Sequence, residues 1–287
     1  MTLTPPQIVT PALFSVMLAL GLNLRPEAMH HWRTRPGLPL RVLLGSCLLV
    51  PLLAWLLLQT PWSEALSRPA RHAIALMALC PSAPLALHKA DKAGGDRQLA
   101  ALLQISAALA AIVTIPILGL AFRHTFQLEG WDVRPVDVAL QVGRVQVLPL
   151  LLGMGLRWRW PLLAERIAPR LNQLANGLLL VLVVVVLIKA GPQLVFLLAT
   201  NLLALPAMAL IVAASLLIGA AMAADDGSER RTTALVSAMR NPGLALFFAG
   251  AHGKGLEGLK LLILGYVLVT LVLSIPLVRR SRRGESA

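Results

Sequence analysis

Residues 230–253 read RRTTALVSAMRNPGLALFFAGAHG, an apolar segment of membrane-spanning length that is interrupted at its centre. The interruption, Arg240-Asn241-Pro242-Gly243, combines a charge, a proline and a glycine. Proline removes a backbone donor and its ring clashes with the preceding turn of a helix. Backbone that is freed in this way is tolerated inside a membrane only where it is buried in protein or lines a water-filled cavity. The segment therefore predicts a helix that breaks near mid-membrane inside a larger helical bundle.

A second segment, residues 75–96, is interrupted in a similar way and reads ALMALCPSAPLALHKADKAGGD, with Pro81 and Pro84 in mid-span. Each break lies in the second segment from the end of its half of the chain. This arrangement predicts an inverted repeat of the kind found in secondary transporters, where broken helices form the binding site. The first repeat, of four helices, is residues 1–122, and the second, of five helices, is residues 136–283. The alternative is two harmless kinks, which membrane helices tolerate.

The composition indicates that most of the chain lies in lipid. Of its 287 residues, 57% are hydrophobic and 14% are charged, and its mean hydropathy is +0.75, whereas soluble domains average about 45–50% and about 25%. We predict an all-α polytopic membrane protein that forms one transmembrane domain, residues 1–287. Its nine predicted helices are residues 8–24, 42–58, 73–87, 99–122, 145–156, 171–188, 194–224, 232–251 and 259–278. The fifth is weak, and its alternative start is near residue 136. The segment at 194–224 is too long to stand upright and is predicted to tilt.

The formal net charge of +13 fits either a nucleic acid partner or basic cytoplasmic loops. If the N-terminus is outside, the inner side of a nine-helix protein holds 17 Lys and Arg residues and the outer side holds 8, and Arg240 is the remaining one of the 26. This asymmetry predicts an outer N-terminus, a cytoplasmic C-terminus and no nucleic acid partner. The basic tail could contact anionic membrane lipid. Cys47 and Cys80 lie in apolar runs and form no disulfide framework or zinc site, so no metal or cofactor is expected.

Three motifs resemble those of the bile acid:sodium symporter family. They are MLALGLNL followed by RPEAM at residues 17–29, the CP break with small residues at 80–83, and MRNPGLA at 239–245. The corresponding family elements look like MGLTL, CCPGG and MQNSGLA. The resemblance implies a panel domain and a core domain in which two broken helices cross, with substrate bound near the crossing. It also implies a divergent bacterial-type member, and hence a location in the bacterial inner (plasma) membrane.

The chain departs from the family where the resemblance implies sodium ligands. A Ser-Asn pair, a Glu, a Gln and two hydroxyl residues of the family are replaced here by Ala86, Leu87, Val236, Arg240, Ala100 and Gln104. Sodium, like other hard cations, needs oxygen ligands. We therefore expect that transport is not coupled to sodium. The alternative is that the ion sites have moved, for instance to backbone carbonyls at the breaks.

Arg240 is the strongest single candidate for a functional residue. A charge at the bilayer centre costs about 2.5–3.5 kcal/mol on insertion scales, so such a residue normally faces the protein interior and has partners. Its guanidinium could bind an anionic substrate or replace the sodium ion. It could instead donate hydrogen bonds to carbonyls that the breaks leave free. Asp and Glu lie almost wholly in the predicted loops, so no carboxylate in a membrane segment is an obvious partner.

The other candidates surround the two breaks. Asn241 resembles a substrate-contacting asparagine of the family and could also cap the helix that follows. His88 could carry a proton or could simply mark the end of a membrane segment. The full set of predicted substrate-binding residues is Arg240, Asn241, Gln104, Ser82, Pro84, His88 and Ser237. The predicted helix breaks are at Pro81, Pro84, Pro242 and Gly243.

The sequence therefore predicts a secondary active transporter of a small organic anion that works by alternating access without sodium. Protons are the candidate coupling ion. The alternative is a sodium-dependent symporter of a bile-acid-like organic anion with relocated ion sites. An intramembrane enzyme is not expected, since HExxH, GxSxG and a membrane Asp pair are missing from the sequence. A sensor is disfavoured because no signalling domain is recognised, and no oligomeric state follows from the sequence.

Overall fold

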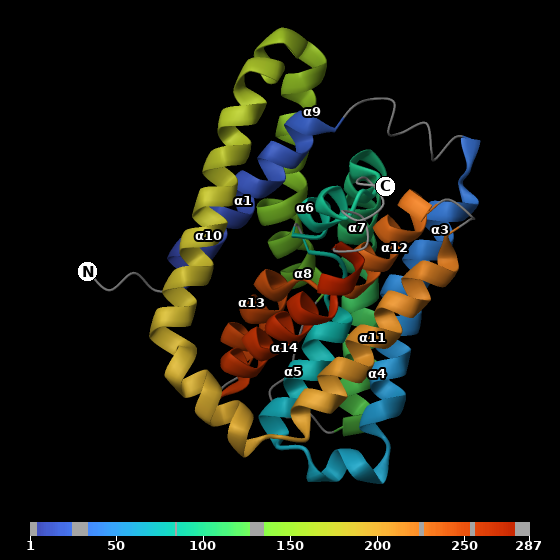
Figure 1. Ribbon diagram of the computed structural model, residues 1–287, viewed down its shortest axis with the longest axis vertical. Coiled ribbons are helices and arrows are strands. Elements are labelled where there is room, and N and C mark those ends of the chain that lie inside the picture. Colours follow the sequence, from blue (N-terminus) through green and yellow to red (C-terminus); the bar gives the residue numbers. More distant parts are fainter. Residues whose placement is uncertain are drawn as a thin grey trace.

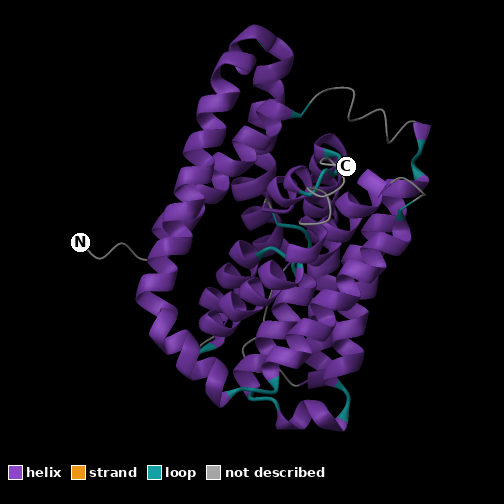
Figure 2. Cartoon of the chain, viewed as in Figure 1, coloured by secondary structure: helices purple, strands orange, loops and turns teal. Residues whose placement is uncertain are grey.

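The structure is a computed structural model that describes residues 5–24, 34–83, 85–126, 135–223, 227–252 and 256–278. Within these ranges the chain forms helices joined by short turns, with no strand (Figures 1 and 2). In chain order the elements are α1 (Pro5–Asn23), α3 (Gly37–Leu44), η2 (Gly45–Leu49), α4 (Val50–Leu58), η3 (Pro61–Ala65), α5 (Arg68–Leu79), α6 (Leu85–Lys92), α7 (Arg97–Phe126), α8 (Pro135–Val142), η4 (Gly143–Val147), α9 (Leu148–Arg159), α10 (Pro161–Thr200), α11 (Ala204–Met222), α12 (Gly227–Ala238), α13 (Pro242–His252) and α14 (Leu259–Leu273).

Several of these helices have the length and apolarity needed to cross a membrane. In the described part of the chain there are five, and they are Gly37–Leu58, Arg97–Phe126, Val136–Arg159, Ala204–Met222 and Leu259–Val278. Each overlaps a segment that was predicted from hydropathy. Their outer surfaces carry large exposed apolar side chains such as Ile117, Leu120 and Leu217. Such surfaces suit contact with lipid, because soluble proteins rarely expose extended apolar patches.

Two of the long helices contain a π-helical turn, and proline explains where it lies. The π-turn η2 begins at Gly45 and is followed by Pro51, and η4 begins at Gly143 and is followed by Pro149. A proline inside a helix has no N–H to donate, so the carbonyls of the preceding turn lose a partner. A π-turn is a common local adjustment to such a defect and is frequent at functional sites. One of these freed carbonyls contributes to the site described below.

Helix α1 packs mainly against α9 and α10 (Figure 1). Glycines on both helices allow the backbones of α1 and α9 to touch. A Cβ atom added to Gly21 would collide with the carbonyl of Leu150, and one added to Gly153 would collide with the carbonyl of Leu18. Among the remaining helices, α11 packs against α12 and α14, and α5 packs against α4 and α14, while contacts of α7 with α8 and of α10 with α14 join the two groups. The molecule thus contains two groups of closely packed helices.

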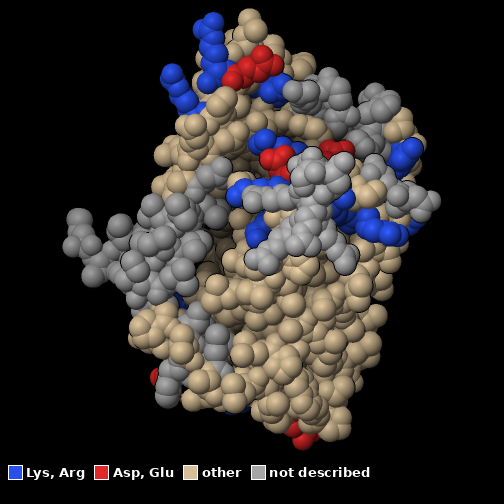
Figure 3. Space-filling model, viewed as in Figure 1, with Lys and Arg blue, Asp and Glu red and all other residues tan. Residues whose placement is uncertain are grey.

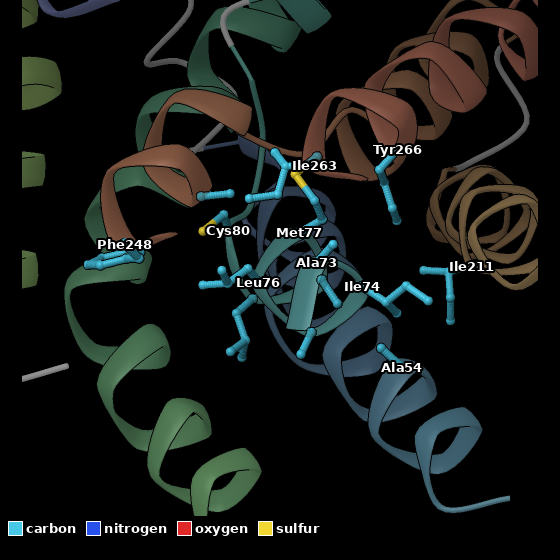
Figure 4. Close-up of a cluster of buried hydrophobic side chains, with 14 of the residues drawn as sticks. Ala54, Ala73, Ile74, Leu76, Met77, Cys80, Ile211, Phe248, Ile263 and Tyr266 are labelled. Atoms are coloured by element: carbon cyan, nitrogen blue, oxygen red, sulfur yellow. The ribbon is translucent and has the colours of Figure 1, made fainter. Parts of the chain in front are cut away.

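The largest hydrophobic cluster lies within the second group and surrounds α5 (Figure 4). It joins α5 to α4, α11, α13 and α14. Ile74 of α5, Ile211 of α11 and Phe248 of α13 are almost completely buried in it. Burial of a side chain of this size stabilises a protein by about 1.5–3 kcal/mol in water, although within a membrane close packing supplies most of the gain. This cluster fixes the end of α5, where the first break begins.

The predicted boundary between the sixth and seventh membrane helices was wrong. The prediction ended one helix at residue 188 and began the next at 194, with Lys189 outside the membrane. Instead α10 continues to Thr200 with Pro192 inside it, and the turn falls at residues 201–203. Proline is tolerated inside membrane helices where neighbouring groups satisfy the freed backbone, so Pro192 did not mark an end. The next helix, α11, has 19 residues and a length of about 28 Å, so its length no longer implies a tilt.

Charged side chains are unevenly distributed on the face that Figure 3 shows. Described Lys and Arg side chains gather towards one end of this face, and most of the remainder is uncharged. A belt without charge beside a basic end is the surface expected of a protein whose cytoplasmic loops are basic.

Candidate functional site

The two interrupted segments meet in the second group of helices. Helix α5 ends at Leu79 and α6 begins at Leu85, while α12 ends at Ala238 and α13 begins at Pro242. The connecting residues exchange two backbone hydrogen bonds. The N–H of Ala83 donates to the carbonyl of Met239 over 2.8 Å, and the N–H of Asn241 donates to the carbonyl of Cys80 over 3.0 Å. Each break therefore satisfies part of the backbone that the other leaves free, as burial in a membrane requires.

Arg240 donates to carbonyls at the C-terminal end of α5. Its Nε donates to the carbonyl of Met77 over 3.1 Å, and its Nη2 donates to the carbonyl of Ala78. In a continuous helix the Met77 carbonyl would accept from the residue four positions ahead, which is Pro81 and has no N–H. The partner of the Ala78 carbonyl would be Ser82, whose φ of +39° is not helical. Arg240 thus replaces donors that the first break removes.

The other carbonyls that accept from Arg240 also lack a helical partner. Nη1 donates to the carbonyl and to Oγ of Ser46, each over 3.0 Å, and to the carbonyl of Ser237 over 3.3 Å. Ser46 lies in η2, and the residue five positions ahead of it is Pro51, which cannot complete a π-type bond. The Ser237 carbonyl loses its helical donor because the N–H of Asn241 bonds to Cys80. One guanidinium therefore joins three elements of the fold.

The electrostatics of this arrangement are favourable although no carboxylate of the described residues contacts Arg240. Helix C-termini carry partial negative charge, and α5 and α12 both end beside the guanidinium. The side chain is only 2% exposed. Its hydrogen bonds to described residues all go to protein oxygens, so in this conformation it does not face a substrate. The geometry matches the structural role that the sequence left open, in which Arg240 donates to freed carbonyls.

Asn241 and Ser82 present polar atoms at the breaks that have no partner within the described chain. Asn241 Oδ1 accepts from the N–H of Leu244 over 3.1 Å and so caps α13, while Nδ2 is buried without a hydrogen bond. Ser82 Oγ is likewise buried and unbonded. An unsatisfied buried polar group costs about 1–3 kcal/mol. Among the candidate residues, Gln104 Oε1 and Ser237 Oγ are also buried without a partner in the described chain, so all four residues have a polar atom that could bind a ligand.

The remaining candidates are more dispersed. Gln104 of α7 is buried, and its Nε2 contacts Sδ of Met17 at 3.9 Å while Oε1 has no partner among the described residues. Ser237 packs towards α11, where a Cβ on Gly219 would lie 2.8 Å from the Cβ of Ser237. Pro84 falls outside the described residues.

His88 lies on α6, beyond the predicted membrane segment, and is exposed. The burial that it retains, followed by the nearby charge of Lys92, lowers the pKa of its imidazole below the ordinary value. The neutral form is therefore favoured at pH 7. Because the side chain of His88 is exposed, it can exchange protons with solvent.

Three positions that the resemblance assigned to sodium ligands lie in one hydrophobic cluster. Ala86, Ala100 and Val236 are at most 1% exposed and pack together with residues such as Leu103 and Leu235. Sodium would need oxygen atoms here, and this region supplies methyl groups. In the described part of the chain, no group of three or more His, Cys, Asp or Glu residues is placed to hold a metal ion.

A model of the Sodium Bile acid symporter family matches residues 10–197, about two thirds of the chain. The chain belongs to the sodium bile acid symporter family. Comparison with the curated proteins finds no match. Membership in this family of transporters, together with the apolar helices, makes the chain an integral membrane protein with a transport function. The matched residues include the first break and end before α11, so the family assignment does not depend on the MRNPGLA motif.

Sequence reasoning missed several residues that complete the site of this symporter family member. Ser46 and the carbonyls of Met77 and Ala78 were not identified as partners of Arg240. A signal existed for two of them, because Pro51 follows Ser46 by five positions and Pro81 follows Met77 by four. A proline at those distances leaves a carbonyl that needs a donor. Nothing in the sequence pointed to Met17 as the neighbour of Gln104.

Proposed function

We propose that this family member is a secondary transporter of a small organic anion that is not coupled to sodium, with Arg240 as a built-in cation. In transporters with broken helices, sodium is coordinated by unwound carbonyls and by the C-terminal ends of half-helices. The guanidinium of Arg240 occupies that environment, since it bonds to carbonyls at the ends of α5 and α12. This single observation carries the proposal, and the apolar cluster around Ala86, Ala100 and Val236 supports it.

An anion is the favoured substrate because the crossing presents positive potential and free donors. Helix α6 begins at Leu85 and α13 at Pro242, and both N-termini follow directly from the paired breaks. Helix N-termini carry partial positive charge, and in broken-helix transporters they face anionic substrate groups. Asn241 Nδ2 and Ser82 Oγ are buried donors without a partner among the described residues. A carboxylate could accept from both.

The proposed architecture follows from the two groups of helices. Helices α1, α9 and α10 would form the panel domain, and the group around α5 and α12 would form the core domain. Residues 1–122 and 136–283 would be the inverted repeats, and the N-terminus would lie outside a bacterial inner membrane. Alternating access would move one group relative to the other around the crossing.

The competing function is a sodium-dependent symporter of a bile-acid-like anion with relocated ion sites, which the family description favours. Thermal unfolding of the purified protein separates the two. We would add carboxylates from acetate to laurate, and taurocholate, in KCl and in NaCl at equal ionic strength. A ligand that binds only the folded state stabilises it by about 2.7 kcal/mol at 100 times its Kd. We expect equal stabilisation in both salts, and stabilisation that occurs only in NaCl would reject the proposal.

A further inference from the structure

The face of α1 that meets the second group of helices is a single stripe of apolar side chains. Met17, Leu20 and Leu24 are buried in a cluster with Ala101 of α7. Leu13 precedes Met17 by four residues and continues the same stripe, because residues three or four apart share one face of a helix. The stripe runs past both α7 and α13, which carry Gln104 and the second break.

Leu13 lies directly on the second break. A Cβ atom added to Gly243 would be 2.5 Å from Cδ1 of Leu13 and 3.4 Å from Oδ1 of Asn241. Leu13 and the amide of Asn241 therefore approach the same side of Gly243. A side chain at position 243 would require the side chain of Leu13 to move from its place against the break.

Met17 covers the second polar residue of the site. Its Sδ accepts from Nε2 of Gln104 at 3.9 Å, and Met17 is only 2% exposed. Asn241, Gln104 and Ser82 are each at most 3% exposed, so the polar atoms of the crossing are closed to solvent in this conformation. On the side of the site that faces α1, Met17 contacts Gln104 and Leu13 lies against the second break, next to Asn241.

We propose that Leu13 and Met17 close over the crossing and determine the size of the substrate that it admits. This inference rests on the proposed function, because it takes Asn241 and Gln104 as substrate contacts. Helix α1 is fixed to its own group by the Gly21–Gly153 contact and by a hydrogen bond of 3.0 Å from Nδ2 of Asn23 to Oδ1 of Asn172. Helix α1 therefore moves together with α9 and α10 when the gate opens widely. Smaller adjustments to the substrate come from the flexible thioether side chain of Met17.

Thiol labelling tests the gate without requiring any substrate. The reporter is Gln104→Cys in full-length protein whose native cysteines are replaced (Cys47→Ala, Cys80→Ala), treated in detergent with a charged methanethiosulfonate reagent. Leu13→Ala and Met17→Ala should each increase the labelling rate several-fold. Leu18→Ala is the matched control, because Leu18 is rotated by about 100° from Met17 around the helix, and it should leave the rate unchanged.

Faster labelling could also result from misfolding, so a variant that is expected to slow labelling is needed. Leu13→Phe places a larger side chain over the site and should slow the labelling of position 104. A misfolded protein would instead label faster. If Leu13→Ala and Met17→Ala label no faster than Leu18→Ala, or if Leu13→Phe labels faster, the gate does not exist.

The size of the admitted substrate is tested by thermal unfolding with the carboxylate series from acetate to laurate. Leu13→Ala should shift the strongest stabilisation to longer chains, and Leu18→Ala should not. An unchanged preference in Leu13→Ala overturns the role in selectivity. If no carboxylate stabilises any variant, the proposed substrate class has failed, and the labelling rates still decide whether the gate exists.

Discussion

Replacing Arg240 by methionine should destabilise the protein, although it removes a charge from the membrane. The variant leaves four carbonyls without their donors, those of Met77, Ala78, Ser46 and Ser237. Each buried unsatisfied group costs about 1–3 kcal/mol, so four cost roughly 8 kcal/mol at the midpoint of that range. Removing the charge returns about 3 kcal/mol of insertion cost. We therefore expect a net loss of about 5 kcal/mol in the free energy of unfolding.

Arg240→Lys separates charge from geometry. Lysine keeps the positive charge, but its compact ammonium lacks the planar fork that reaches several acceptors at once. We expect it to lose less stability than Arg240→Met, because it can still donate to some of the carbonyls. Arg157→Met is the control for removing an arginine, since among the described residues Arg157 donates to the carbonyl of Leu22 and forms one ion pair with the exposed Glu165.

The assay is equilibrium unfolding of purified protein in mixed micelles, followed by the fluorescence of its six tryptophans. The expected order of stability is wild type, Arg240→Lys, Arg240→Met, with Arg157→Met less affected than Arg240→Met. An Arg240→Met protein that is as stable as the wild type would refute the reasoning. It would show that the hydrogen bonds from the guanidinium to the freed carbonyls do not contribute to stability.

Three further perturbations test separate parts of the structure. Gly153→Ala should lower the thermal midpoint by several degrees, because its Cβ meets the backbone of α1, whereas Gly155→Ala has open space and should not. Asn241→Asp keeps the oxygen that caps α13, removes the Nδ2 donor and adds a buried negative charge, so stability should fall and stabilisation by carboxylates should disappear; retained anion binding would count against the site. The lowered pKa of His88 means that the folded state binds fewer protons than the unfolded state below about pH 6.5. Stability should therefore fall as the pH drops through this range, and less so in His88→Gln; equal acid sensitivity would contradict the local environment described for His88.

The sequence was sufficient for the features that depend on local chemistry. Pro81 and Pro242 interrupt apolar segments, and the helices end beside them, because a proline cannot continue the hydrogen-bonding pattern. The family was also recognisable from short motifs, and the match over residues 10–197 confirms it. Proline was an unreliable guide within α10, because this helix continues through both Pro169 and Pro192.

The features that depend on contacts between distant residues could not be predicted. Arg240 and Ser46 are 194 positions apart, and their pairing depends on a π-turn that hydropathy does not reveal. The contact of Leu13 with Gly243 likewise depends on how α1 lies against the second group of helices. A single sequence records which carbonyls lack a donor, but it does not record which side chain supplies one.

The central claim is that Arg240 serves as the cation of this transporter in place of sodium. The most direct test is the thermal midpoint of the purified wild-type protein titrated with NaCl, against KCl at equal ionic strength and without any anionic substrate. An occupied sodium site would stabilise the folded state by about 2.7 kcal/mol at 100 times its Kd. We predict that the two curves coincide. A saturable increase that is specific to sodium would contradict the claim.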